Sequence, residues 1–151
     1  ENDIAAALYA SLKFIPQRSR LAKHLTYVLR DYEENVSAEK CFANIHARWD
    51  EHSAHDWCHT ISNARIVVAA LLYGNSFDRA ICLAVENGFD TDCNGATVGS
   101  IWGIMYGADC IRDEWKQPLH GKLDTSIFGV GTVEIQSLID TTLRHIHQSE
   151  A

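Results

Sequence analysis

The chain has 151 residues, a formal net charge of −7, 46% hydrophobic residues and 22% charged residues. This composition is ordinary for a globular protein, and the length suits a single domain with a sizeable core over residues 1–151. The acidic balance and the absence of a basic run argue against a nucleic-acid partner. No targeting or membrane-spanning segment is visible, so we expect no membrane partner.

The five cysteines form an odd set without a Cys-x-x-Cys pair. No signal peptide precedes them, so reduced thiols in a cytoplasmic protein are a better prediction than a disulfide framework. The chain opens on Glu1, not on Met, and enters a helical pattern at once. We therefore expect a fragment of a longer protein.

Apolar residues recur at helical spacing along almost the whole chain, which predicts an all-α fold, a compact orthogonal bundle of several helices. The expected helices cover residues 4–12, 21–29, 37–45, 60–73, 77–86, a glycine-striped stretch up to 107, and 132 or 133 to 147. Pro16 ends the first, and Ser37 and Ser76 are expected to cap two of the others. Residues 48–56 and 117–132 have loop composition, the second with a short extended piece at Ile127-Phe128.

Two carboxylates, Asp90 and Asp92, follow Gly88 where a loop is expected to enter a helix. Glycine turns the backbone freely there, and Asn94 or Asp92 can serve as the N-cap. The positive end of the helix dipole favours negative charge beside it. Hard carboxylates at this spacing suit Mg²⁺, Mn²⁺ or Ca²⁺. The alternative is that one aspartate caps the helix and the other is solvated.

Four glycines follow at every fourth position: Gly95, Gly99, Gly103 and Gly107. Each glycine inside a helix costs about 1 kcal/mol relative to alanine, so we expect another backbone to pack closely against this stripe. Glycines at this spacing also occur in membrane helices. However, the uncharged run ends at Asp109 and is shorter than the roughly 20 residues that a span needs.

A second cluster of polar residues precedes the apolar helix at 60–73. His55, Cys58 and His59 have the residue types of a zinc site, but Asp56 stands where a zincin helix needs glutamate. The pair His55-Asp56 also resembles the motif of HD-type metal phosphohydrolases. Solvated or locally hydrogen-bonded histidines are the favoured interpretation. His59 and Asn63 share a helix face, and a ligand is one partner that such polar groups can have.

A family resemblance connects these segments. Residues 88–99, with 80–85 ahead of them, resemble the C-terminal signature of the ADP-ribosylglycohydrolase family, as do residues 59–64 leading into 67–74. The resemblance implies an all-α fold that binds two Mg²⁺ or Mn²⁺ ions. It also implies hydrolysis of the glycosidic bond at the ribose C1″ of ADP-ribosyl groups on proteins or small molecules.

Carried onto this sequence, the resemblance implies that Asp90 and Asp92 are metal ligands. Cys93 stands where the family usually has a third ligand, a threonine, and a thiol is a softer ligand than a hydroxyl for Mg²⁺. Residues near the expected site are predicted to bind substrate: Trp57, His59, Asn63, Gly88, Phe89 and Thr91.

The acidic motifs of the family's N-terminal half have no counterpart before Asp90. The chain therefore resembles the C-terminal half, and a separate N-terminal half or a second copy is expected to complete the site. The predicted function is metal-dependent hydrolysis of ADP-ribosyl or related N/O-glycosidic bonds, in an ADP-ribosylated protein or an ADP-ribose-like small molecule. The alternative is a non-catalytic relative that binds an ADP-ribose-like ligand or has a structural role.

Overall fold

The computed structural model describes residues 3–149, which form eight α-helices and one two-stranded sheet. The all-α class predicted from helical spacing is confirmed. Close packing divides the chain into two compact units, one ending at Cys110 and the other beginning at Ile111. Each unit is described by itself, and a single domain over residues 1–151 stays a prediction.

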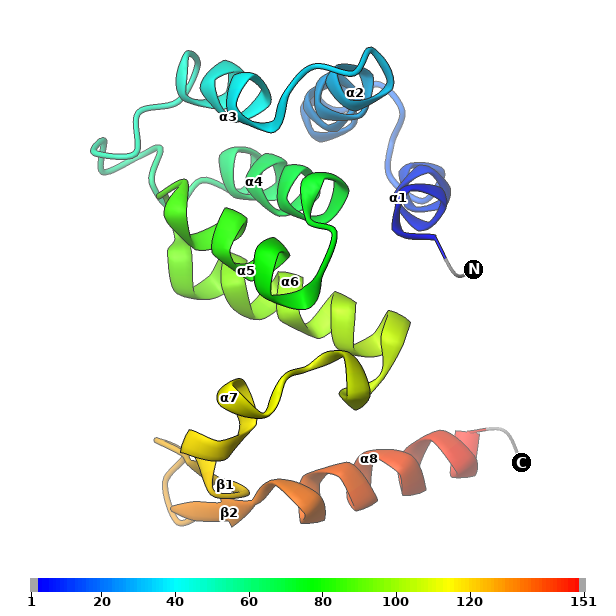
Figure 1. Cartoon of the computed structure of the whole chain (residues 1–151), viewed down its shortest axis with the longest axis vertical. Coiled ribbons are helices and arrows are strands. Elements are labelled where there is room, and N and C mark those ends of the chain that lie inside the picture. The colour runs from blue at the N-terminus through cyan, green and yellow to red at the C-terminus, as the bar shows by residue number, and fades with distance from the viewer. Residues whose placement is uncertain (1–2, 150–151) are drawn as a thin grey trace. The chain divides into compact units, whose positions relative to one another are not determined.

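The first unit consists of six α-helices and a short 3₁₀ turn (Figure 1). In chain order these are α1 (Ile4–Leu12), α2 (Arg20–Glu33), α3 (Ala38–His46), α4 (Thr60–Tyr73), α5 (Phe77–Glu86), α6 (Thr91–Tyr106) and the turn η1 (Ala108–Cys110). The bounds of α4 and α5 are those predicted from the sequence. The second helix is longer than predicted, since α2 continues through polar residues to Glu33.

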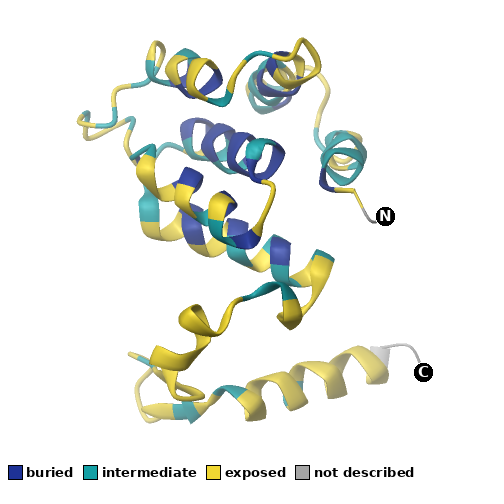
Figure 2. Ribbon diagram, viewed as in Figure 1, coloured by how far each residue is buried: buried dark blue, intermediate teal, exposed yellow. Residues whose placement is uncertain are grey.

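Helix α4 is the centre of this unit, because it packs against each of the other five helices. Its sequence is apolar almost all round, as expected for a helix with neighbours on several sides. Ile66, Ala69 and Ala70 on α4 are fully buried, and Figure 2 shows buried residues along most of its length. Side chains on different sides of α4 therefore face different neighbours.

Two predicted N-caps are confirmed. The Ser37 side chain accepts a hydrogen bond from the Lys40 backbone N–H at the start of α3, and Ser76 does the same for Arg79 at the start of α5. Such a cap contributes about 1 kcal/mol to stability.

The predicted cap of the next helix was wrong. The N-cap residue of α6 is Asp90, not Asp92 or Asn94, and its side chain makes no capping hydrogen bond to the described residues. The Asn94 side chain donates instead to Asn63 of α4, and Cys58 donates to the Asp90 carboxylate. Contacts with distant segments therefore position the start of α6.

The glycine stripe packs less closely than predicted. Gly95 and Gly99 face α5, where a Cβ on Gly95 would lie 3.1 Å from the Val85 Cγ2, so side chains and not a second backbone approach the stripe. A Cβ on Gly103 would have no atom of residues 3–149 within 4 Å. Gly107 lies beyond α6, where it is the C-cap with φ +76°. Only the first half of the stripe has a packing role.

Gly103→Ala is expected to raise the free energy of unfolding by about 1 kcal/mol, because alanine favours the helix and the site has room for the methyl group. Gly95→Ala should gain less or lose stability, since its Cβ would crowd Val85. Urea denaturation of both variants checks this. Equal effects of the two substitutions would contradict the described packing.

The second unit contains α7 (Asp113–Lys116), the 3₁₀ turn η2 (Gln117–Leu119), strands β1 (Lys122–Asp124) and β2 (Thr132–Glu134), and α8 (Ile135–Ser149). The strands are antiparallel, with Leu123 opposite Val133. The extended piece predicted at Ile127-Phe128 was wrong, because these two residues lie in the connection between the strands. The last helix begins at Ile135, later than predicted, since Thr132 and Val133 suit a strand and are paired in one.

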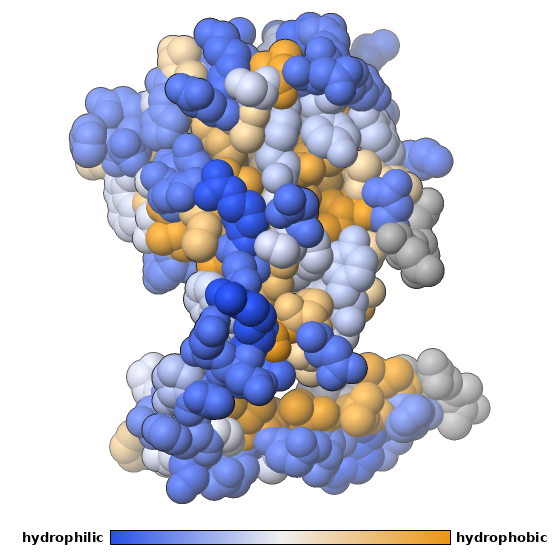
Figure 3. All heavy atoms as spheres, in the orientation of Figure 1, coloured by the Kyte–Doolittle hydropathy of each residue, from blue (hydrophilic) through white to orange (hydrophobic). Residues whose placement is uncertain are grey.

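Helix α8 is amphipathic, and Figure 3 shows hydrophobic side chains gathered along one side of it. Leu138, Ile139 and Leu143 are each between 43% and 48% exposed. In the described part of the chain, no helix combines the length and apolar character needed to cross a membrane.

Candidate functional site

The loop between α5 and α6 has a constrained backbone. Gly88 and Phe89 both have positive φ, +73° and +60°. A Cβ on Gly88 would lie 1.6 Å from a carboxylate oxygen of Glu51, and the Phe89 N–H donates to the same oxygen at 3.4 Å. The Phe89 side chain is buried, and its ring lies 5.0 Å from that of His46. These contacts fix the path of the chain into Asp90.

Asn63 of α4 connects this loop to the segment that precedes α4. Its Oδ1 accepts from the Asp90 backbone N–H at 3.0 Å and from the Asn94 Nδ2 at 2.8 Å. Its Nδ2 donates to the carbonyl oxygens of Trp57 and His59, both at 3.0 Å. One side chain therefore makes four hydrogen bonds and holds the start of α6 against the start of α4.

The predicted metal ligands lie together at the start of α6. The ligand atoms of Asp90, Asp92 and Cys93 are all within 4.8 Å of one another, and this is the single group of three or more such residues in the described structure. Asp90 is half-buried, whereas Asp92 and Cys93 are exposed. The two carboxylates fit Mg²⁺ or Mn²⁺, which prefer oxygen, while the thiol fits a softer ion.

Cys58 is a neighbour of this group that the sequence did not assign to it. Its thiol donates to the Asp90 Oδ2 at 3.4 Å. The hydrogen bond with Asp90 is the main cause that raises the pKa of the Cys58 and Cys93 thiols. Burial opposes ionisation of Asp90, but hydrogen bonds with Cys58, Asp92 and Cys93 lower its pKa overall. The group is thus a carboxylate anion with protonated thiols beside it.

Cys58, Asp90 and Cys93 stand at the polar end of an open groove of about 450 Å³, formed mainly by α4 and α6. Asp92 is not part of the groove lining. The polar end is formed by Cys58, Asn63, Asp90, Cys93 and Asn94. Apolar side chains, among them Leu8, Val67, Leu71 and Ile101, line the rest. An apolar groove with a few convergent polar groups at one end is the usual form of a small-molecule site.

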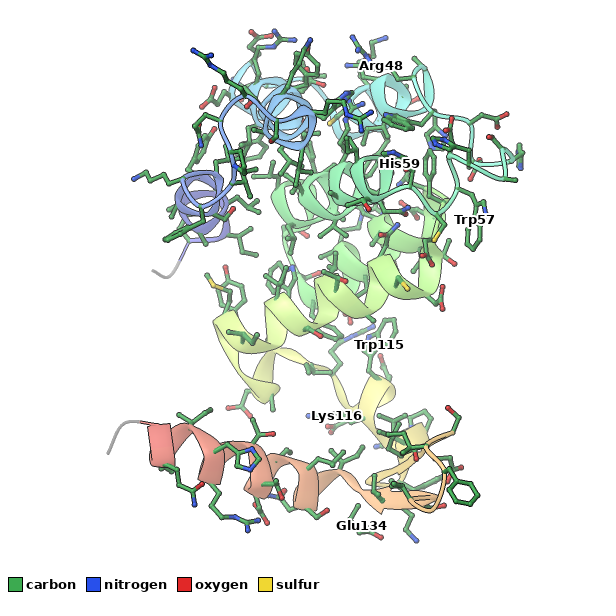
Figure 4. All side chains as sticks on the ribbon, turned by 180° about the vertical axis from the view of Figure 1, so that it is seen from behind. Arg48, Trp57, His59, Trp115, Lys116 and Glu134 are labelled. Atoms are coloured by element: carbon green, nitrogen blue, oxygen red, sulfur yellow. The ribbon has the colours of Figure 1, made fainter. Side chains whose placement is uncertain are left out.

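The predicted substrate-binding residues do not all lie at the groove. Asn63 lines the groove, and Trp57, His59, Gly88, Phe89 and Thr91 are not part of its lining. The His59 Nδ1 accepts from the Ile61 N–H at the start of α4, and its ring lies 4.7 Å from the Trp49 ring. Figure 4 shows His59 inside the unit and Trp57 at its edge, where 44% of Trp57 is exposed. The role of all six residues stays a prediction.

The zinc and HD-type alternatives gain no support from the described residues. The His55 Nδ1 lies 2.7 Å from the Asp56 Oδ1 in an exposed turn, and this hydrogen bond is the main cause that lowers the pKa of Asp56. The Cys58 thiol donates a hydrogen bond to Asp90, and the His59 side chain caps α4. The His55 and His59 rings lie 5.2 Å apart, but with Cys58 they form no metal-binding group among residues 3–149, which agrees with locally hydrogen-bonded histidines.

Comparison with known proteins covers nearly the whole chain. A family model described as ADP-ribosylglycohydrolase matches residues 1–150. Neither the curated proteins nor the solved structures compared with the chain gave a match. The resemblance seen around residues 88–99 is therefore confirmed at the level of the family.

Proposed function

The chain belongs to the ADP-ribosylglycohydrolase family, and we propose that it is a hydrolase of ADP-ribosyl linkages in which Asp90 and Asp92 bind a divalent metal ion. The observation that carries the proposal is the convergence of Asp90, Asp92 and Cys93 within 4.8 Å, with Asp90 and Cys93 at the polar end of the groove. The four hydrogen bonds of Asn63 support it, because they hold the backbone of Asp90 in place.

Mg²⁺ or Mn²⁺ is the ion proposed, with two ions in the complete site. When bound, such ions polarise oxygen atoms and orient hydroxyl groups and water at the reacting bond. Asp90 and Asp92 supply hard oxygen ligands, but they fill only part of the six coordination positions around an octahedral ion. We propose that the remaining ligands are water, substrate hydroxyls and a protein segment other than these residues, from a separate N-terminal half or a second copy of the chain.

The groove suggests how the substrate is oriented. Its carboxylate end suits ribose hydroxyl groups, which donate hydrogen bonds to carboxylates and amides. Its apolar walls on α4 and α6 suit the less polar faces of a nucleoside. An ADP-ribosyl group on a protein or small molecule would thus lie with the ribose that carries the scissile C1″ bond near Asp90 and the rest of the ligand along the apolar walls.

The test combines metal binding with product release. We expect calorimetry to show binding of Mn²⁺ or Mg²⁺, and ADP-ribosylated protein to release ADP-ribose when the metal and the completing segment, a second copy or an added N-terminal half, are both present. Chelation by EDTA should stop the release. Release that continues unchanged in EDTA would contradict metal dependence. Metal and ADP-ribose binding without any release would identify the non-catalytic alternative.

The non-catalytic relative is the second candidate function, and the presence of Cys93 beside the two carboxylates favours it. A thiol beside the two carboxylates weakens the preference of the site for Mg²⁺. The protein would then hold an ADP-ribose-like ligand in the same groove without hydrolysing it.

Cys93→Ser replaces the thiol sulfur with oxygen and tests the effect of this ligand. Mg²⁺ is expected to bind more tightly by about 1 kcal/mol, roughly fivefold in Kd. Cys82→Ser, at another exposed cysteine, is the matched control and should leave the Kd unchanged. Calorimetric titration measures both. Unchanged Mg²⁺ binding in Cys93→Ser would show that the side chain at this position does not contact the ion.

A further inference from the structure

A second cavity of the first unit lies between α2, α3 and α4. Its volume is about 420 Å³, and its described lining consists of Tyr27, Arg30, Asp31, Asn44, Ala47, Arg48 and Arg65. Three of these seven residues are arginines, in a chain whose net charge is −7. We call this the arginine cavity. None of its lining residues lines the groove at Asp90.

Arg65 is the least expected of the three. It is the one charged residue of the apolar helix α4, and only 1% of it is exposed. Its Nε and Nη1 have no hydrogen-bond partner within residues 3–149. A buried guanidinium normally has its donors paired, because unpaired burial of a charge is costly. The side chain therefore lacks an acceptor that the cavity has room to hold.

The other two arginines lie together at this cavity. The Arg30 and Arg48 guanidinium carbons are 5.4 and 5.2 Å from the centroid of the Tyr27 ring. Arg30 has only a 4.0 Å contact with Glu34, and both side chains are more than half exposed. Arg48, labelled in Figure 4, has no ion pair in the described part of the chain. Both can turn toward an anion at little cost.

One acid opposes the three arginines. Asp31 is the single acidic residue in the described lining, and its Oδ2 accepts from the Asn44 Nδ2 at 3.1 Å. The charged side chains around the arginine cavity therefore sum to a net excess of positive charge.

Further unpaired nitrogens lie nearby. Four of the five buried side-chain nitrogens without a partner in the described residues belong to Arg65, His24 and Trp49. The His24 ring lies 5.9 Å from that of Trp49 and 5.8 Å from that of Tyr27. Buried polar groups rarely lack partners. His24 and Trp49 do not line the arginine cavity, and His24 contacts it through Tyr27, so Arg65 alone carries the indication of a missing acceptor there.

We infer that the arginine cavity binds a phosphate-type dianion. Guanidinium groups bind phosphate oxygens through paired, charge-assisted hydrogen bonds. A dianion would balance the excess positive charge and supply acceptors for the unpaired nitrogens of Arg65. The cavity is larger than inorganic phosphate, so it also accommodates the phosphoryl group of a small phosphomonoester. This site is independent of the metal group, because Asn63 and Val67 face the groove from another side of α4.

The test measures binding of inorganic phosphate by calorimetry. It uses the Asp90→Asn/Asp92→Asn chain in EDTA, so that no metal can recruit the anion. Saturable binding of one phosphate per chain is expected, and succinate, a dicarboxylate, should bind at least about tenfold more weakly. Arg48→Gln should weaken phosphate binding about tenfold, the loss of one charge-assisted hydrogen bond. Arg65→Met should abolish it.

Arg79→Gln on α5 is the matched control, since Arg79 is an exposed arginine that does not line this cavity. The affinity of the Arg79→Gln protein for phosphate should be unchanged. If Arg65→Met fails to fold by circular dichroism, Arg48→Gln and Arg30→Gln, at two exposed arginines of the cavity, decide the result, and each should weaken phosphate binding about tenfold. Absence of saturable binding, equal affinity for succinate, or an equal loss in Arg79→Gln would each overturn the inference.

Discussion

Asp92→Asn is expected to lower metal-dependent release of ADP-ribose about a thousandfold, because a bound ion supplies several kcal/mol of transition-state stabilisation. Asp92 is exposed, and asparagine has the same shape, so the thermal midpoint should change little. Mn²⁺ affinity should fall along with activity. Steady-state release assays and calorimetry measure the two effects on the same preparation.

Asp109→Asn is the control for this prediction, since Asp109 is also exposed and lies outside the group at Asp90. Its metal affinity and its activity should match those of the wild type. An Asp92→Asn protein that retained wild-type Mn²⁺ affinity would show that this carboxylate is not a ligand.

Asn63→Ala is expected to lower the free energy of unfolding by about 3 kcal/mol. The substitution removes four hydrogen bonds, and the loss of the three that are partly buried costs about 1 kcal/mol each. Metal affinity should fall as well, because Asp90 loses the contact that holds its backbone. Urea denaturation and Mn²⁺ titration check the two effects.

Asn75→Ala is the matched control, because Asn75 is an exposed asparagine between α4 and α5. Its stability should change by less than about 0.5 kcal/mol. Similar losses in the two variants would mean that Asn63 has no special role in joining α4 to α6.

Local sequence signals were sufficient to place the helices of the first unit and to give the bounds of α4 and α5. Apolar spacing together with Ser76 predicted the bounds of α4 and α5, because helix ends depend on neighbouring residues. The cap of α6 was not predictable in this way. Asn94 is a good N-cap residue, but its side chain bonds to Asn63, a partner 31 positions away in the chain.

The short strands of the second unit were missed for a related reason. β1 and β2 each have three residues, and neither is long enough for an alternating pattern to stand out. Pairing between Leu123 and Val133 is a contact across a loop, which periodicity does not record. The predicted extended piece was placed inside that loop.

The convergence of the three predicted metal ligands could be predicted from the sequence, whereas their surroundings could not. The spacing of Asp90, Asp92 and Cys93 at a glycine-bearing loop indicated that they converge, and the family resemblance gave them a role. The hydrogen bond from Cys58 to Asp90 depends on how α4 packs against α6, and no spacing shows it. Arg65 did carry a signal, since a lone charge in an apolar helix needs a partner.

The most direct test is the anomalous diffraction of crystals soaked in Mn²⁺. We predict a manganese peak bonded to carboxylate oxygens of both Asp90 and Asp92, at the polar end of the groove between α4 and α6. A crystal without such a peak, in which the two side chains point apart into solvent, would contradict the proposed metal centre and leave the paired aspartates as surface residues at a helix end.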